Sequence, residues 1–346
     1  MHNQSHPALR VPACPTYNGP AFHSRQRSVM LRLLPLLLVA LLLALPARAE
    51  SIQVEASPVS LHDDREVERI GALAWRAGYA LTSDNPNFGG LSDLAFTAQG
   101  RLLIAGDKGY WVDARPTMTD GHLAGLTDVR MGAYRKLDGA PVTEGWQKDG
   151  ESLTLIDGVP VVGFEQLHRL RAYPDGLDAR ATRVPEPEGL ARANGNKGAE
   201  ALTQLADGRL LLLVEARLDD GDRDYTGWLR GTDGTWRALQ LARRAGYRPT
   251  GAAQLPGGDL VVLTRAYNPL AGARVRLQRI PLETVKPGAR LDGPELAHFR
   301  APYIVDNFEG VAARRVDGET RIYLLSDDNF NFLQRTLLLE FALTGE

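Results

Sequence analysis

Acidic residues recur at equivalent ends of a repeated two-strand sequence, and their side chains are the groups best suited to chemistry. The copies begin at Ser92, Glu151, Glu200, Thr250 and Glu309, and each holds an apolar strand, a turn with glycine and a second apolar strand. The two strands of a hairpin are antiparallel, so the start of the first lies beside the end of the second. Four hairpins thus pair carboxylates at one rim: Asp93 with Asp107, Glu151 with Glu165, Glu200 with Glu215, and Glu309 with Asp327.

The rim carboxylates predict a metal site, because crowded like charges require protons, basic partners or a cation. Their ligand atoms are all oxygens, which suit Ca²⁺, with Mg²⁺ as the alternative. Asp328 joins the expected ligands, since the polar stretches 306–310 and 326–331 coincide with the fifth copy. A second interpretation stays open, in which the acids pair with local arginines or cap turns.

Basic residues beside the rim predict an anionic ligand. Lys108 and Arg217 follow acids that end two of the second strands. Arg265 takes the place of an acid in the fourth copy, where it either clamps an anion or neutralises neighbouring carboxylates. We expect Lys108, Arg217, Arg265 and Asn329 to bind the anionic group of a substrate.

Other catalytic arrangements have less support in the sequence. His168 is the one histidine near a repeat acid and is a candidate proton shuttle, although a lone histidine more often has a structural role. The chain has no Gly-x-Ser-x-Gly sequence, no Walker loop and no dinucleotide fingerprint. These absences disfavour a serine hydrolase of the α/β type and a nucleotide-dependent enzyme.

The elements that position the acids are short strands at a regular spacing. The copies recur every 54 residues on average, which is typical of four-stranded propeller blades. Third and weaker fourth strands follow each hairpin, but the last copy ends after its third strand. The strand-like segment 67–81 supplies the missing strand and removes a free sheet edge. We therefore predict an all-β propeller with five blades visible in the repeats and six possible, an antiparallel sandwich being the alternative.

The first 49 residues resemble an export leader rather than part of the fold. Arginines flank Met30, an apolar run extends over 33–45, and Ala47-Arg48-Ala49 fits a cleavage site. The apolar run is too short to span a membrane as a helix. We expect translation to start at Met30, contact with the membrane only during export, and a periplasmic or secreted location.

Residues 50–346 are expected to form a single propeller domain that relies on its core. They carry 35 basic and 42 acidic residues, a net charge of −7, which disfavours nucleic acid as a partner. Cys14, the only cysteine, lies in the leader, so the rest of the chain has no disulfide and no thiol chemistry. We expect the protein to be a monomer.

A resemblance to a known family rests on Gly89-Gly90-Leu91-Ser92-Asp93, on the repeat starts, and on the closing stretches 306–310, 326–330 and 334–338. These sequences resemble the phytase-like family described as having esterase-like activity of phytase, from about residue 66 to the C-terminus. The resemblance implies an exported bacterial protein, a propeller-like fold, and hydrolysis of phosphoesters or other esters. Alkaline propeller phytases, which bind several calcium ions around an acidic channel, are similar in kind. Thr250-Gly251-Ala252 departs from the acidic pattern, so any ring of metal ligands is broken there.

Two functions are consistent with these features. The first is a metal-dependent hydrolase that acts on a small anionic ester, a phosphate monoester or a related compound. The second is a propeller without catalysis that binds a ligand or an envelope partner and uses Ca²⁺ structurally. Fold alone does not separate them, because propellers host many unrelated activities.

Overall fold

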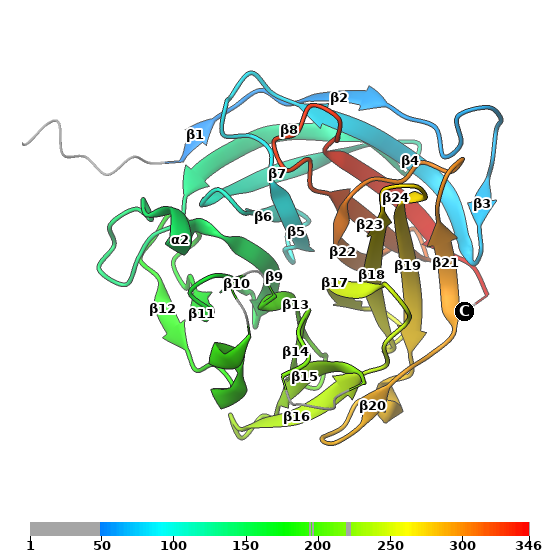
Figure 1. The fold of residues 1–346 in the computed structure, drawn as a ribbon. Helices are drawn as coiled ribbons and strands as arrows, with labels where there is room; N and C mark the ends of the chain where they lie inside the picture. Colours follow the sequence, from blue (N-terminus) through cyan, green and yellow to red (C-terminus); the bar gives the residue numbers. More distant parts are fainter. Residues whose placement is uncertain (1–48, 194, 196, 219–222, 346) are drawn as a thin grey trace, which may run out of the picture. The chain divides into compact units, whose positions relative to one another are not determined.

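Five sheets, antiparallel except for one short parallel pair at an outer edge, surround a central channel as the blades of a propeller (Figure 1). The computed structural model describes residues 49–193, 195, 197–218 and 223–345, which belong to one compact unit. The predicted export leader lies outside the described residues except for Ala49. The prediction of an all-β propeller is confirmed, and the number of blades is five.

The blades follow one another along the chain, each with its inner strand at the channel. The first two sheets contain the following strands, from the inside outward: β5 (Leu91–Phe96), β6 (Leu102–Gly106), β7 (Tyr110–Thr119), β8 (His122–Ala133) and β1 (Glu50–Ser51) in blade 1; β9 (Gly150–Ile156), β10 (Val159–Phe164), β11 (Arg169–Ala172) and β12 (Thr182–Val184) in blade 2. The short helix α2 (Gly145–Lys148) precedes blade 2, and a 3₁₀ turn, η1 (Glu188–Arg192), precedes blade 3.

The other three sheets repeat this arrangement with different outer strands. Their strands are β13 (Ala199–Gln204), β14 (Leu210–Val214), β15 (Tyr225–Arg230), β16 (Trp236–Leu241) and β20 (Arg290–Leu291) in blade 3; β17 (Arg248–Gln254), β18 (Leu260–Asn268), β19 (Gly272–Ile280) and β21 (Glu295–Phe299) in blade 4; β22 (Phe308–Val316), β23 (Glu319–Ser326), β24 (Leu337–Leu343), β4 (Leu73–Thr82) and β2 (Glu55–Pro58) in blade 5. A second 3₁₀ turn, η2 (Leu282–Thr284), follows β19, and β3 (Arg69–Ile70) pairs with β4.

Blade 5 is built from both ends of the described chain. The N-terminal strand β4 pairs with β24, from Leu73 beside Leu343 to Ala80 beside Leu337. The strand therefore completes the last blade, as the sequence predicts for 67–81. The pairing covers an edge of β24 that would otherwise expose unpaired backbone groups.

Every inner strand begins with a β-bulge in its pairing with the second strand. The bulged residues, skipped in the register, are Ser92, Glu151, Glu200, Thr250 and Glu309. A bulge leaves one residue unpaired and changes the direction of its side chain. The five bulges therefore mark one structurally equivalent position at the same end of all inner strands.

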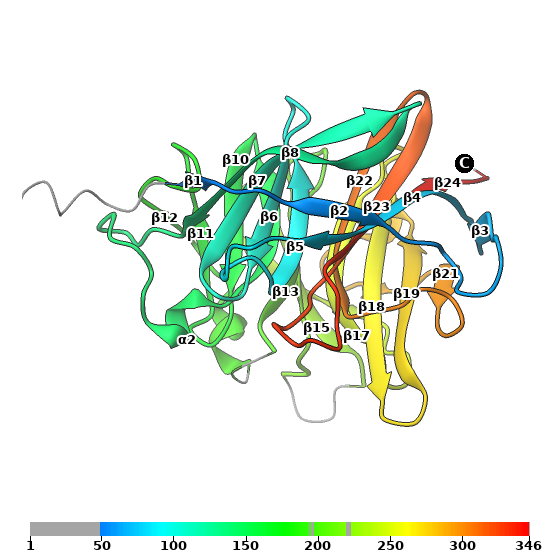
Figure 2. The same cartoon turned by 90° about the horizontal axis from the view of Figure 1, so that it is seen from above.

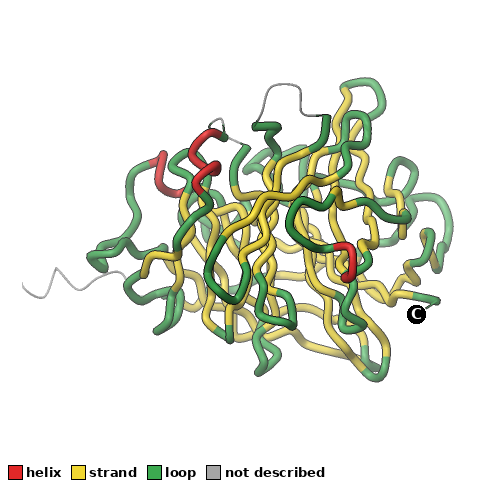
Figure 3. The backbone as a smooth tube through the Cα atoms, turned by 90° about the horizontal axis from the view of Figure 1, so that it is seen from below, coloured by secondary structure: helices red, strands yellow, loops and turns green. Residues whose placement is uncertain are grey.

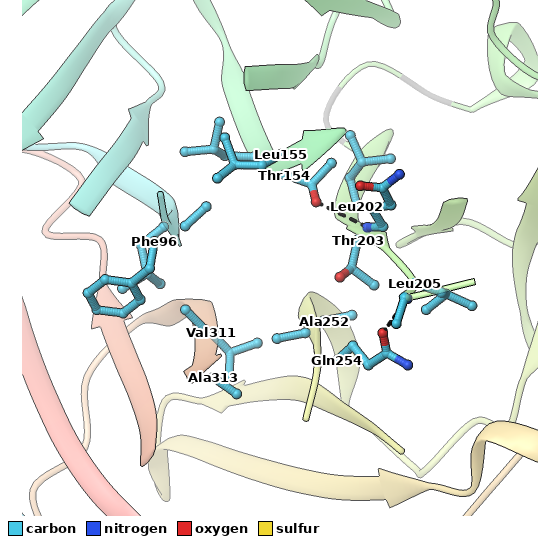
Figure 4. Close-up of a pocket in the computed structure, with 17 residues that line it drawn as sticks. Phe96, Thr154, Leu155, Leu202, Thr203, Leu205, Ala252, Gln254, Val311 and Ala313 are labelled. Atoms are coloured by element: carbon cyan, nitrogen blue, oxygen red, sulfur yellow. Dashed lines mark hydrogen bonds between the residues drawn. The ribbon is translucent and has the colours of Figure 1, made fainter. Parts of the chain in front are cut away.

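The opposite end of the channel is a neutral pocket of 310 Å³ (Figure 4). It is lined by the ends of the five inner strands, and none of its lining residues is charged. Polar side chains there join neighbouring blades: Thr154 Oγ1 accepts from the Gln204 amide at 3.1 Å, and Gln254 Oε1 accepts from the Ala206 amide at 2.6 Å. The two channel ends thus differ, one being acidic and the other neutral.

Loops on the acidic side carry most of the irregular structure. Figure 2 shows α2 and the loop between β18 and β19 on one side, with the turn between β22 and β23 on the other. Strands dominate the backbone and helices are few (Figure 3). Within the described residues, no helix is long and apolar enough to span a membrane.

Because β4 completes blade 5 and so closes the ring of blades, we expect this strand to contribute to the stability of the whole domain. We expect Leu73→Ala to lower the free energy of unfolding by about 2–5 kcal/mol, because Leu73 is fully buried against blade 5 and its removal leaves a cavity. Chemical denaturation followed by tryptophan fluorescence measures this change. Leu270→Ala is the matched control, since Leu270 is 99% exposed. An unchanged transition for Leu73→Ala would show that β4 is peripheral.

Candidate functional site

The acidic channel mouth is assembled from the bulged glutamates and from acids that follow the second strands. Glu151, Glu200 and Glu309 come from blades 2, 3 and 5, and burial raises the pKa of each. The negative charges of Glu309 and Glu165 raise the pKa of Glu151 further, because carboxylates of different blades lie close together here. The structure thus brings together four of the predicted ligands around one opening.

Blade 2 supplies the tightest group of carboxylates. Oxygen atoms of Asp149, Glu151 and Glu165 all lie within 4.8 Å of one another. The Glu165 amide donates to the Asp149 carbonyl at 2.8 Å, and Gln166 Nε2 donates to Asp149 Oδ2 at 2.7 Å. Sequence reasoning missed Asp149, although an acid two residues before a repeat acid was a visible signal.

Carboxyl groups at this mouth also raise one another's pKa. After burial, the charges of Glu165 and Glu151 raise the pKa of Glu200, and the charges of Glu309 and Asp149 raise the pKa of Glu151. A raised carboxyl pKa means that the protonated form is favoured over the charged one. A bound cation would act in the opposite direction and favour the charged forms.

The pKa of two acids at the mouth lies near neutrality. Burial raises the pKa of Glu165 to about 7, and it raises the pKa of Asp107 to about 6. The Gly198 amide donates to Glu165, and Lys108 lies beside Asp107, so both rises are partly offset. The surrounding protein removes most of the water that would otherwise stabilise the charged carboxylates, and this loss of hydration raises their pKa.

Asp107 keeps one oxygen without a partner among the described residues. Its Oδ1 is buried and unbonded, while its Oδ2 lies 3.7 Å from Lys108 Nζ. Gly90 packs directly on this carboxyl group, because a Cβ atom at Gly90 would lie 2.0 Å from Oδ1. Glycine is required at this close approach, and the φ of Gly90, 57°, lies in the left-handed region that glycine favours.

The acids of the loop after β23 serve different purposes. Asp327 is buried and accepts from the Asn329 amide at 2.7 Å, and the charges of Glu309 and Asp107 contribute to its raised pKa after burial. Asp328 accepts from the Gly90 amide at 2.9 Å and from Thr336 Oγ1 at 3.0 Å. Asp327 thus belongs to the mouth, whereas Asp328 holds the loop against blade 1.

Asp93 lies one residue beyond the bulge and differs in position from the other repeat acids. Its carboxylate accepts from the Leu94 amide and, across the blade boundary, from the Leu153 amide, both at 2.8 Å. Burial raises the pKa of Asp93, and backbone donors including Val311 act in the opposite direction. Asp93 therefore joins blades 1, 2 and 5, and the bulged position in blade 1 is held by Ser92.

Two of the rim acids are neutralised by arginines of blade 4. Arg265 lies 3.2 Å from Glu309, and Arg248 lies 2.7 Å from Glu215. Sequence reasoning included Arg265 but missed Arg248, which precedes the fourth repeat by two residues. Pairing with arginine thus applies to Glu309 and Glu215, whereas a metal site at the other acids stays a prediction.

The remaining predicted residues surround the mouth at different distances from the acids. Lys108 is exposed, with Nζ 5.4 Å from the centre of the Phe330 ring, and Arg217 is exposed after β14. Asn329 is exposed and donates to Gln334 Oε1 at 3.3 Å. His168 Nε2 lies 3.0 Å from the Ala193 carbonyl, so this ring nitrogen contacts the backbone rather than a repeat acid.

The fold and this site define a five-bladed propeller with an acidic channel mouth that is partly neutralised by arginine. The family model described as "Esterase-like activity of phytase" matches residues 86–330. The chain belongs to this Phytase-like family. The match covers all five hairpins as far as the loop after β23.

Comparison with curated proteins gave no match. Among solved structures, a catalytically inactive virginiamycin B lyase from Staphylococcus aureus is 12% identical, with a TM-score of 0.40 and coverage of 84% of this chain and 100% of that chain. A gluconolactonase from Xanthomonas campestris is 13% identical, with a TM-score of 0.40 and coverage of 87% and 88%. A protein of unknown function from Dyadobacter fermentans is 12% identical, with a TM-score of 0.42 and coverage of 86% and 94%. Similarity at this level transfers no substrate or mechanism.

The raised carboxyl pKa values predict that metal-free protein loses stability as the pH rises. Between about pH 4 and pH 7 the folded state holds protons on Asp107 and Glu165 that the unfolded state has released. The free energy of unfolding then falls by about 1.4 kcal/mol per pH unit for each excess proton. Thermal melts in EDTA from pH 5 to 8 should show a decreasing melting temperature.

Glu165→Gln should flatten this pH dependence, because an amide does not titrate. Glu55→Gln, at an exposed position of β2, is the matched control and should keep the slope of the parent protein. Constant or increasing stability of the parent protein across this window would contradict the protonated state of the mouth.

Proposed function

We propose that this protein is an exported, metal-dependent hydrolase of phosphate monoesters or related esters that acts at the acidic channel mouth. The observation that carries the proposal is the group Asp149, Glu151 and Glu165, whose oxygens lie within 4.8 Å of one another beside acids of two further blades. Membership of the Phytase-like family supports ester hydrolysis as the reaction class. The leader sequence supports export to the periplasm or the medium.

The donor atoms fit Ca²⁺, with Mg²⁺ as the alternative. All are carboxylate oxygens, which hard cations prefer, and the mutual rise of the carboxyl pKa values marks a place where positive charge is favourable. Asp149, Glu151, Glu165 and Glu200 would hold such an ion, and Asp107 offers an unpartnered oxygen nearby. The bound ion would polarise a phosphoryl or carbonyl oxygen and lower the pKa of water.

The basic side chains at the mouth orient the anionic group in this proposal. Arg265 reaches Glu309 through one nitrogen at 3.2 Å, and the guanidinium fork leaves further donors for an oxyanion. Lys108 is exposed beside Asp107 and contributes attraction from the opposite side of the mouth. A mixed set of acids and bases suits an anion that is bridged to a cation better than it suits a cation alone.

Asp107 is the group best placed to accept a proton from the attacking water. A pKa of about 6 leaves this carboxyl group mostly ionised at neutral pH and still basic enough for proton transfer. Oδ2, which lies beside Lys108, is the oxygen available for this transfer, because Oδ1 is buried against Gly90. Lys108 stabilises the ionised form.

The metal ligands predict a joint loss of calcium response and activity. Added Ca²⁺ should raise the melting temperature of EDTA-treated protein and restore hydrolysis of a phosphomonoester panel. Glu151→Gln should lose both effects, with kcat/KM reduced about 100-fold, because the polarising charge is worth several kcal/mol in the transition state. Calorimetry and chromogenic assays measure the two responses.

Glu55→Gln is the control for this experiment and should behave like the parent protein. Hydrolysis that is indifferent to EDTA and to Glu151→Gln would refute the metal-dependent mechanism. Stabilisation by Ca²⁺ without turnover of any ester would instead favour a propeller that uses the ion structurally to bind a ligand or an envelope partner.

The role of Arg265 predicts a change in substrate affinity. Arg265→Gln should raise KM for a phosphomonoester roughly tenfold, since it removes one charge-assisted contact to the anion. Arg237→Gln is the control, because Arg237 pairs with Asp233 at the end of blade 3 away from the mouth. A normal KM in steady-state assays of Arg265→Gln would show that this arginine only neutralises Glu309.

A further inference from the structure

A second pocket, lined mainly by basic and apolar side chains, lies beside blade 2. It has a volume of 260 Å³ and is formed by β11, the end of β10 and the segment that leads from β8 toward α2. Four cationic residues line it: Arg135, Lys136, Arg169 and Arg171. Asp138 is the only acid in the lining, so the pocket contrasts with the acidic channel mouth.

Arg169 is a buried cation without a carboxylate partner in the described part of the chain. It is 8% exposed, and its guanidinium stacks on Phe164 at 4.2 Å from the ring centre. Its hydrogen bonds go to two neutral groups, the carbonyls of Leu167 and Gln147. Burial, and then the charge of Arg171, lower the pKa of Arg169 to about 10. Such a cation is costly unless an anion compensates it.

Two further cations of the pocket have carboxylate partners outside its lining. Arg171 lies 3.1 Å from Glu186, and Lys136 lies 3.7 Å from Glu144. These two pairs leave Arg169 as the cation of the pocket whose hydrogen bonds go only to neutral groups. Arg135, 4% exposed, also lines the pocket.

The chemistry of the walls limits what could bind. Arginine forks match the paired oxygens of phosphate and carboxylate groups. Leu137, Val142 and Leu167 provide an apolar wall, and Phe164 and Tyr173 an aromatic one. The volume is somewhat below the usual range of pockets for drug-sized ligands. We propose that this pocket binds a small organic anion with one phosphate or carboxylate group and a compact apolar part.

This pocket is separate from the channel mouth although both use the end of β10. The Phe164 ring packs against Tyr134, which follows β8 of blade 1, whereas the Glu165 carboxylate accepts from the Gly198 amide, which precedes β13 of blade 3. Successive residues of a strand point to opposite faces, so the two sites occupy opposite sides of one strand end. Binding in the basic pocket thus requires neither a metal nor catalysis.

Titration with phenylphosphonate and with benzoate tests the proposal, and EDTA is present so that the channel holds no metal. Isothermal titration calorimetry of the parent protein should show saturable binding of at least one probe. Lys136→Gln should weaken it roughly tenfold, the loss expected for one charge-assisted contact. Arg169→Gln should abolish it, and the free variant should melt at the same or a higher temperature because an uncompensated buried charge is gone.

Two controls separate this pocket from other basic positions. Arg130→Gln changes an arginine of β8 that lies 3.6 Å from Asp178 and does not line the pocket, and it should keep the parent affinity. Arg265→Gln changes the channel mouth and should also keep it. Unchanged affinity in Lys136→Gln, binding lost only in Arg265→Gln, or no saturable binding of either probe would overturn the proposal. If Arg169→Gln does not fold, Lys136→Gln decides.

Discussion

Mutual repulsion of carboxylates at one channel mouth is the constraint around which the rest of this structure is arranged. The bulge at the start of each inner strand directs one side chain out of the ladder, and in three blades this side chain is a glutamate. Neighbouring acids then raise one another's pKa after burial, which favours a bound proton or a bound cation. This crowding of acids lowers the stability of the fold. Groups of buried acids with strongly raised pKa values are characteristic of functional sites rather than of structural ones.

Blade 4 reduces the repulsion and makes the mouth asymmetric. Its bulged residue is Thr250, and its second strand carries Arg265 in place of an acid, so positive charge faces the glutamates of the other blades. Arg248 neutralises Glu215 in the same region. An entirely acidic ring would favour cations alone, whereas this arrangement offers both a site for a cation and donors for an anion.

Closure of the propeller keeps these side chains in place. The mouth depends on five inner strands held in a ring, and β4 completes blade 5 by pairing with the C-terminal strand β24. Asp93 also helps to hold the ring together, because its carboxylate accepts from the Leu94 amide of its own blade and from the Leu153 amide of blade 2. The basic pocket of blade 2 lies outside this ring, on the other side of the strand end that carries Glu165.

The sequence alone predicted the repeated hairpins, the closing strand and the acidic side of the propeller, because hairpin pairing and alternation are local properties, but it left five or six blades open. It also placed Glu151, Glu165 and Glu200 at that rim, where their role as ligands stays a prediction. Only the tertiary structure showed that Ser92, rather than Asp93, occupies the bulged position, since a shift by one residue is invisible without the ladder. Asp149 and the pocket around Arg169 likewise emerged from packing, because their neighbours come from separate loops whose approach is fixed by the ring of blades.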